Sequence, residues 1–159
     1  MTCLTVPVRI CAIFILVIFT ASCGSVKPLF ECEQPAYSLN IKVATDINPA
    51  EDGRASPVIL NIFALEGERQ FEQEEFISLY QDPDSVLGRD LLSAVKLKEL
   101  IPGEARTEKL VFDQRTRFIG IMAEFIRYDD ADTKLVIPRT ECEAKVDLFV
   151  DRLSMRFDQ

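Results

Sequence analysis

Apolar and polar side chains alternate along several short segments of this chain, with turn-forming residues between the segments. Every second residue from Tyr37 to Val43 is apolar. A period of two places these side chains on one face of an extended chain, which predicts a half-buried strand. The segment Pro57–Leu65 is apolar on both faces. This pattern is typical of a strand that lies inside a sandwich.

Further short apolar segments follow at similar spacing, with Pro-Gly and Asp-rich turns between them. Asp129–Asp132 is expected to form the tip of a hairpin. The segment 86–95 is ambiguous between a helical turn and the start of a strand. The pattern as a whole predicts a mainly β protein, a two-sheet β-sandwich of seven or eight strands. Its later strands are expected within residues 95–100, 108–112, 116–128, 134–137 and 145–157.

The period changes between Arg69 and Tyr80, where the apolar residues fall near one face of a helix. Three glutamates lie in the opening turns, where a helix dipole favours negative charge. One added short helix is therefore expected, and Asp82-Pro83 is expected to end it. Its apolar residues are Phe71, Phe76, Leu79 and Tyr80, and its glutamates are Glu72, Glu74 and Glu75.

The first residues have the pattern of an export signal. Ile10–Phe19 contains no polar side chain, and Arg9 is the only charged residue before it. The apolar stretch is shorter than the roughly 20 residues that cross a bilayer, so a cleaved signal peptide is favoured over a transmembrane anchor.

The next four residues, Thr20–Cys23, resemble a bacterial lipobox, in which small residues precede a lipidated cysteine. The resemblance implies cleavage before Cys23, a diacylglyceryl thioether on its sulfur and usually acylation (palmitate) of its amino group. Two or more acyl chains hold a protein stably on a bilayer. Gly24 stands where an Asp would signal inner-membrane retention, so the outer membrane is favoured. An ordinary signal peptide with a coincidental cysteine is the alternative.

The expected organisation is therefore a lipoprotein signal peptide over residues 1–22, a lipidated tether over 23–35 and a β-sandwich domain over 36–159. Two cysteines, Cys32 and Cys142, remain after cleavage and lipidation. An even pair in an oxidising periplasm suggests a disulfide that joins the two ends of the domain. Two separate buried thiols are the alternative.

The composition excludes most kinds of enzyme. The chain has no histidine, which removes imidazole-based triads, metal sites and proton shuttles. It has 26 acidic and 18 basic residues, a balance that argues against nucleic-acid binding. The acidic residues Asp129, Asp130 and Asp132 lack the ligand spacing of a calcium loop. We expect no catalytic residue, no metal site and no cofactor besides the covalent lipid.

The segment between the first two strands is the strongest candidate for a binding site. It is 12 residues long, more than a hairpin needs, and it contains Asn-Pro and Asp-Gly turns. Long loops on a rigid scaffold often carry binding residues, although a plain surface connection is an alternative. The candidate residues are Asp46, Ile47, Asn48, Pro49, Ala50, Glu51, Asp52, Gly53, Arg54, Ala55, Ser56 and Pro57.

The order of these blocks resembles a known family. After the lipobox cysteine and the first strand come Asn48, Ser56–Leu65, Phe71–Leu79, Asp90–Leu92, Leu100–Glu104 and Phe118–Phe125. From roughly Tyr37 to Phe157 the chain resembles the TssJ family, outer-membrane lipoproteins of bacterial type VI secretion systems. The Ser-Pro-Val start of the second strand and the Pro-Gly-Glu turn are its most specific pieces.

This resemblance implies a transthyretin-like sandwich with an added helix. It also implies a lipoprotein on the periplasmic face of the outer membrane that binds the periplasmic C-terminal region of an inner-membrane TssM protein. The family's contact loop joins the first two strands, which in this sequence is Asp46–Pro57. The alternative function is a periplasmic lipoprotein that binds a carbohydrate or small ligand. That function would need a concave, aromatic-lined site. A hydrolase is disfavoured by the missing histidine.

Overall fold

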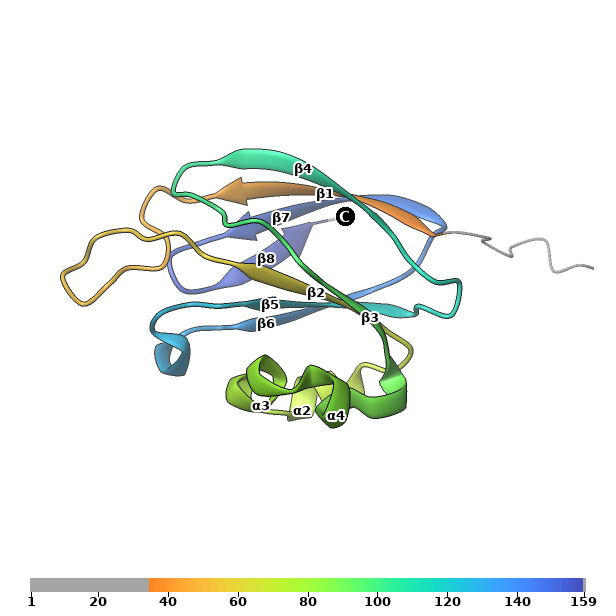
Figure 1. Cartoon of the computed structure of the whole chain (residues 1–159). Helices are drawn as coiled ribbons and strands as arrows, with labels where there is room; N and C mark the ends of the chain where they lie inside the picture. Colours follow the sequence, from red (N-terminus) through yellow and green to blue (C-terminus); the bar gives the residue numbers. More distant parts are fainter. Residues whose placement is uncertain (1–34, 159) are drawn as a thin grey trace, which may run out of the picture. The chain divides into compact units, whose positions relative to one another are not determined.

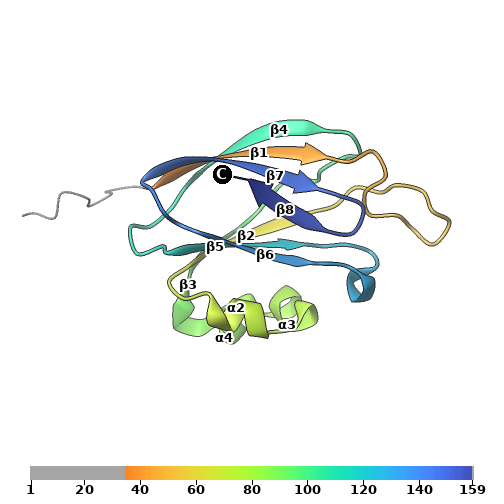
Figure 2. The same ribbon diagram turned by 180° about the vertical axis from the view of Figure 1, so that it is seen from behind.

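The computed structural model describes residues 35–158, which form two four-stranded sheets packed face to face and a helical layer (Figures 1 and 2). The fold class predicted from the sequence, a mainly β sandwich, is confirmed. The strands are β1 (Ala36–Val43), β2 (Leu60–Leu65), β3 (Leu91–Lys96), β4 (Ala105–Val111), β5 (Phe118–Ala123), β6 (Lys134–Pro138), β7 (Glu143–Val150) and β8 (Met155–Asp158). The helices are α2 (Arg69–Gln73), α3 (Phe76–Gln81) and α4 (Pro83–Leu87), with the 3-10 turns η1 (Gly88–Asp90) and η2 (Tyr128–Asp130).

The first sheet has the strand order β4-β1-β7-β8, and β1 is hydrogen-bonded on both sides. It is antiparallel to β4 and parallel to β7, although β1 and β7 lie at opposite ends of the sequence. The second sheet has the order β3-β2-β5-β6, in which every pair is antiparallel. The sequence pattern placed most of the strands. It was wrong in two places: β3 lies at Leu91–Lys96, mainly in the ambiguous segment and not at 95–100, and the closing segment 145–157 holds two strands, β7 and β8. The parallel pairing of the chain's two ends is visible only in the structure.

The core lies between the two sheets. On β1 the alternating apolar residues are all buried, as the period of two predicts, and the first sheet contributes further side chains such as Val146 and Leu148. From the second sheet, β2 contributes Leu60 and Ile62. Burying these apolar surfaces supplies the main favourable term in the stability of the fold.

A second apolar cluster explains why β2 is apolar on both faces. Phe63 and Leu65 point away from the sandwich core and pack under the helical layer, against Phe71 of α2. The rings of Phe63 and Phe71 lie 5.4 Å apart. A Cβ added at Gly120 of β5 would lie 3.0 Å from the ring of Phe71, so a glycine is needed for the ring to sit this close to the sheet.

The helical segment differs in detail from the single helix expected over Arg69–Tyr80. The backbone becomes extended at Glu74 and Glu75, with ψ of 149° and 153°, which separates α2 from α3. Asp82-Pro83 ends α3 but also begins α4, because the Asp82 side chain accepts a hydrogen bond from the Ser85 amide. No helix in the described part of the chain is long and apolar enough to cross a membrane.

The predicted signal peptide, the predicted lipidation site Cys23 and most of the predicted tether lie outside the described residues. Cys142 is disulfide-bonded, and every other cysteine of the chain precedes residue 35, so its partner also lies outside them. The Ala36 amide donates to the Cys142 carbonyl over 2.9 Å, which places the start of β1 beside Cys142. This neighbourhood supports the pairing of Cys32 with Cys142, which stays a prediction.

Candidate partner-binding loop

The predicted binding loop Asp46–Pro57 extends from one end of the sandwich, between β1 and β2 (Figure 1). Backbone hydrogen bonds fix the chain on both sides of it. Before the loop, the Ala44 amide donates to the Val150 carbonyl at the end of β7 over 2.9 Å. After it, Val58 and Leu100 exchange two backbone hydrogen bonds. The loop therefore begins and ends at positions that are fixed by the sandwich.

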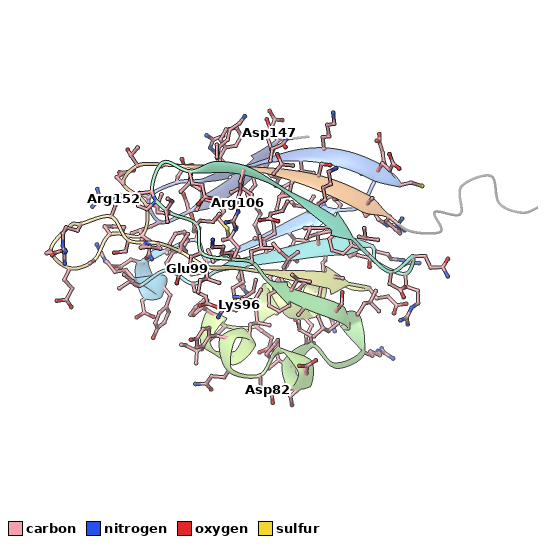
Figure 3. All side chains as sticks on the ribbon, turned by 45° about the horizontal axis from the view of Figure 1, so that its top comes forward. Asp82, Lys96, Glu99, Arg106, Asp147 and Arg152 are labelled. Carbon is pink, nitrogen blue, oxygen red and sulfur yellow. The ribbon has the colours of Figure 1, made fainter. Side chains whose placement is uncertain are left out.

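Asn48 ties the base of the loop to two other segments. Its side-chain Nδ2 donates to the Pro57 carbonyl over 2.6 Å, and its Oδ1 accepts from the Ile126 amide over 2.7 Å. Its backbone amide donates to the Arg152 carbonyl over 2.8 Å. Arg152, labelled in Figure 3, lies at the loop end of the sandwich. Only 1% of Asn48 is exposed, so these bonds form where water does not compete with them.

The backbone of Asn48 explains why this residue type stands here. Its φ is +45°, in the left-handed region that asparagine tolerates better than most residues with a side chain. The same residue therefore makes the turn and satisfies the polar groups that the turn buries. Asn-Pro predicted a loop, but the long-range bond to Ile126 could not be read from the sequence.

The tip of the loop is a compact turn. The Gly53 amide donates to the Ala50 carbonyl, and the Ala50 amide donates to the Arg54 carbonyl, both over 2.9 Å. Gly53 has a φ of +79°, which requires glycine or a strained residue. The Asp52 carboxylate accepts from the amide of Arg54 over 3.1 Å and from its guanidinium over 2.6 Å. These bonds, the amide first, hold the pKa of Asp52 below its ordinary value.

The structure divides the 12 candidate residues by exposure. Ile47, Asn48 and Pro49 are buried, and Ala50 and Ser56 are half-buried. These five position the loop. A partner could contact the remaining residues directly: Asp46, Glu51, Asp52, Gly53, Arg54, Ala55 and Pro57 are exposed.

The exposed residues of the loop carry charged groups that could pair with a protein partner. Its exposed part combines three carboxylates and one guanidinium on a turn whose backbone is already ordered. A preordered loop loses little conformational entropy on binding, which favours specific contact with another protein. Among residues 35–158, no group of three or more Cys, Asp or Glu side chains is arranged to hold a metal ion.

Comparison with known proteins gives the family. The family model described as "Type VI secretion lipoprotein, VasD, EvfM, TssJ, VC_A0113" matches residues 35–153. No curated protein matches the chain in sequence.

Three similar solved structures agree in fold. The T6SS lipoprotein TssJ1 from Pseudomonas aeruginosa has a TM-score of 0.73 at 23% identity, covering 77% of this chain and 94% of that one. Serratia marcescens Lip, a membrane-bound component of the type VI secretion system, has a TM-score of 0.74 at 22% identity, covering 80% and 99%. A chain in the structure described as "T6SS protein TssM C-terminal domain (869-1107) from EAEC" has a TM-score of 0.67 at 20% identity, covering 78% and 98%. With a family model matched over most of its length, this chain belongs to the type VI secretion lipoprotein family.

Proposed function

We propose that this protein attaches the type VI secretion membrane complex to the periplasmic face of the outer membrane. Lipid on Cys23 holds the chain on the bilayer, and the exposed tip of the loop Asp46–Pro57 binds the periplasmic C-terminal region of a TssM-type inner-membrane protein. The role is structural and needs no catalytic group. The lipid supplies membrane affinity, the sandwich supplies rigidity and the loop supplies specificity.

The observation that carries this proposal is the construction of the loop. An exposed turn of polar residues stands on a buried residue, Asn48, that is bonded to the far end of the loop and to two other segments, at Ile126 and Arg152. Such a base holds the exposed turn in one position, which is what specific contact with a partner needs. Membership of the secretion lipoprotein family and the likeness to a chain in a structure described as a TssM domain indicate the kind of partner.

The chain contains its own matched control for a binding experiment. Asp52 and Arg54 form an Asp-x-Arg turn at the tip of the loop, and Asp113 and Arg115 form the same turn elsewhere. The second turn follows Phe112, whose amide donates to the carbonyl of Pro35 just before β1 begins. It therefore lies at the opposite end of β1 from the loop.

The test is capture of a TssM periplasmic fragment by the full lipidated chain in detergent. We expect Asp52→Ala/Arg54→Ala to weaken binding roughly tenfold, because interface energy concentrates in a few central residues. Asp113→Ala/Arg115→Ala should bind as the wild type does. Cys23→Ala should release the chain from the membrane fraction and leave capture in detergent unchanged. Equal capture by both double variants would rule out the loop, and no capture by the wild type would remove the proposed partner.

A further inference from the structure

The net charge of the described protein is concentrated in one region. Residues 66–90, which contain the helical layer, carry eight acidic and two basic side chains. Residues 127–132, around η2, carry three acidic side chains and one basic. The rest of the described chain carries thirteen of each sign, so it is neutral as a whole. The helical layer and the η2 segment therefore create a negative field on one face of the molecule.

Three aromatic rings are stacked where these two acidic segments meet. The ring of Phe76 lies 5.7 Å from that of Tyr80, one helical turn later in α3, and 4.9 Å from that of Tyr128 in η2. The ring planes are within 22° of parallel in both pairs. Tyr80 is 51% exposed although it is a large aromatic side chain. We call Phe76, Tyr80 and Tyr128 the aromatic stack.

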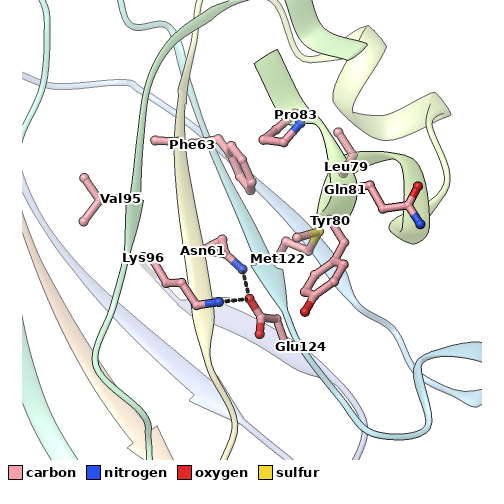
Figure 4. A pocket seen from close by; sticks show the side chains of 11 residues that line it. Asn61, Phe63, Leu79, Tyr80, Gln81, Pro83, Val95, Lys96, Met122 and Glu124 are labelled. Carbon is pink, nitrogen blue, oxygen red and sulfur yellow. Dashed lines mark hydrogen bonds and ion pairs between the residues drawn. The ribbon is translucent and has the colours of Figure 1, made fainter. Parts of the chain in front are cut away.

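In a surface hollow on the Tyr80 side of the stack, the one carboxylate is already paired with a cation. Its volume is about 510 Å³, and Figure 4 shows that it lies between α3 and the outer face of the second sheet. The only carboxylate in its lining, Glu124, is bonded through Oε1 to Lys96 Nζ and to Asn61 Nδ2, each over 2.8 Å. An incoming cation would have to compete with the ammonium of Lys96 for this carboxylate.

A second hollow, at Phe76 and Tyr128, has more carboxylates in its lining than the hollow at Tyr80, and we call it the acidic hollow. Its lining includes four carboxylates and one ammonium group, and within residues 35–158 none of the four carboxylates has a cation within ion-pair distance. Its carboxylates are Glu72, Glu74, Glu75 and Asp129, and its ammonium belongs to Lys134.

The ammonium of Lys134 is already used inside the protein. Nζ donates to the carbonyl oxygens of Phe71 and Glu72, each over 2.9 Å, and to that of Glu74. Its three protons thus cap the end of α2. Burial lowers the pKa of Lys134, against the nearby carboxylates of Glu72 and Glu74, which raise it. The acidic hollow keeps an excess of negative charge beside the half-buried rings of Phe76 and Tyr128.

We propose that the aromatic stack and the acidic hollow form a second docking surface, which binds an arginine-bearing basic segment of a protein partner. A guanidinium combines the two properties that this surface requires, because it stacks on aromatic rings and pairs with carboxylates. A bilayer of anionic lipids and a second copy of this acidic face would both be repelled. The charge of the surface therefore selects a basic protein segment.

The position of this surface supports the inference. Ile126, two residues before Tyr128, is 53% exposed, and its amide is the one that Asn48 holds. Figures 1 and 2 show η2 and the loop Asp46–Pro57 at the same end of the sandwich. A partner at the loop could therefore continue across Ile126 to the aromatic stack. The inference does not depend on the loop's own partner, because it rests on separate residues.

A peptide titration tests the proposal. The probe is a nine-residue fluorescent peptide with four arginines among glycines and serines, and its twin has citrulline, which is uncharged, at the same positions. The full chain in neutral detergent should bind the arginine peptide and not the twin. Glu75→Gln/Asp129→Asn and, separately, Tyr128→Leu should each weaken binding by roughly five- to tenfold. Amide NMR shifts on titration should be confined to residues 72–80 and 126–134.

The control keeps the overall charge change and moves it elsewhere. Glu99→Gln/Glu143→Gln removes the same two charges from exposed positions on the sandwich and should change affinity less than twofold. Equal loss in this control would mean that only the net charge matters, and equal binding of the citrulline peptide would remove the role of the cation. If Tyr128→Leu instead altered the sedimentation of the protein alone, the face would be a contact between copies. Each of these results would overturn the proposal.

Discussion

Two insertions between strands that are consecutive in the sequence extend this sandwich, and they are stabilised in different ways. The loop Asp46–Pro57 joins β1 to β2, and the helical layer joins β2 to β3. The loop is fixed by hydrogen bonds that converge on Asn48. The helical layer is fixed mainly by an apolar cluster around Phe71. A surface element can thus be made rigid by one polar residue or by distributed packing, and the two solutions should fail differently when residues are removed.

The largest effect should come from the apolar side of this comparison. Phe71 is fully buried and packs on Phe63 and against Gly120. Phe71→Ala should lower the free energy of unfolding by about 4 kcal/mol, through lost burial and a residual cavity. Urea unfolding measures this. The exposed Tyr80→Ala in the same layer should cost less than about 1 kcal/mol. Equal costs for the two variants would show that the layer is not anchored by packing.

A smaller but more local effect is expected at the base of the loop. Asn48→Ala should cost about 3 kcal/mol, because it leaves the Ile126 amide and the Pro57 carbonyl without partners and places alanine at a positive φ. Asn48→Gly loses the same bonds without the backbone strain, so it should be more stable than the alanine variant by about 1 kcal/mol. Hydrogen exchange at the Ile126 amide should accelerate in both. Unchanged exchange would contradict the role of this side chain.

The smallest loss of stability is expected at Lys134, and it tests whether hydrogen bonds also hold the helical layer in place. Lys134→Met keeps the length of the side chain but removes the donor from the carbonyls at the end of α2. We expect a loss of about 1.5 kcal/mol, since hydrogen bonds to a charged group are partly offset by its desolvation. Thermal unfolding and amide exchange in residues 71–76 measure it. A loss as large as that of Phe71→Ala would remove the contrast between the two insertions.

The sequence predicted the strands where the hydrophobic pattern is local and complete. The alternation from Tyr37 to Val43 and the doubly apolar β2 were interpreted correctly, because each reports which faces of a strand are buried. The break between α2 and α3 was not predictable from periodicity. It occurs where Lys134, about 60 residues away in sequence, bonds the carbonyls that the break releases.

The loop at the candidate site was predicted in position but not in construction, and its role in binding stays a prediction. Loop length and turn residues located Asp46–Pro57, which the structure shows as an exposed turn on a buried base. That Ile47 and Asn48 are buried follows from contacts with the sandwich core, Ile126 and Arg152, which no local pattern encodes. The charge of the helical layer was visible in the sequence, but its meeting with the η2 segment depends on the fold.

The central position of β1 has a mechanical consequence. Its eight residues span roughly 26 Å, at about 3.3 Å per residue, from the start of the described chain to the approach of the loop. Hydrogen bonds run along both of its edges, to β4 and to β7. A pull between its N-terminal end and the loop would act along the strand axis and be carried by the extended backbone of β1 itself, while the hydrogen bonds on both edges keep the strand in place between β4 and β7. β1 is therefore an extended link that can transmit tension between the two ends of the sandwich.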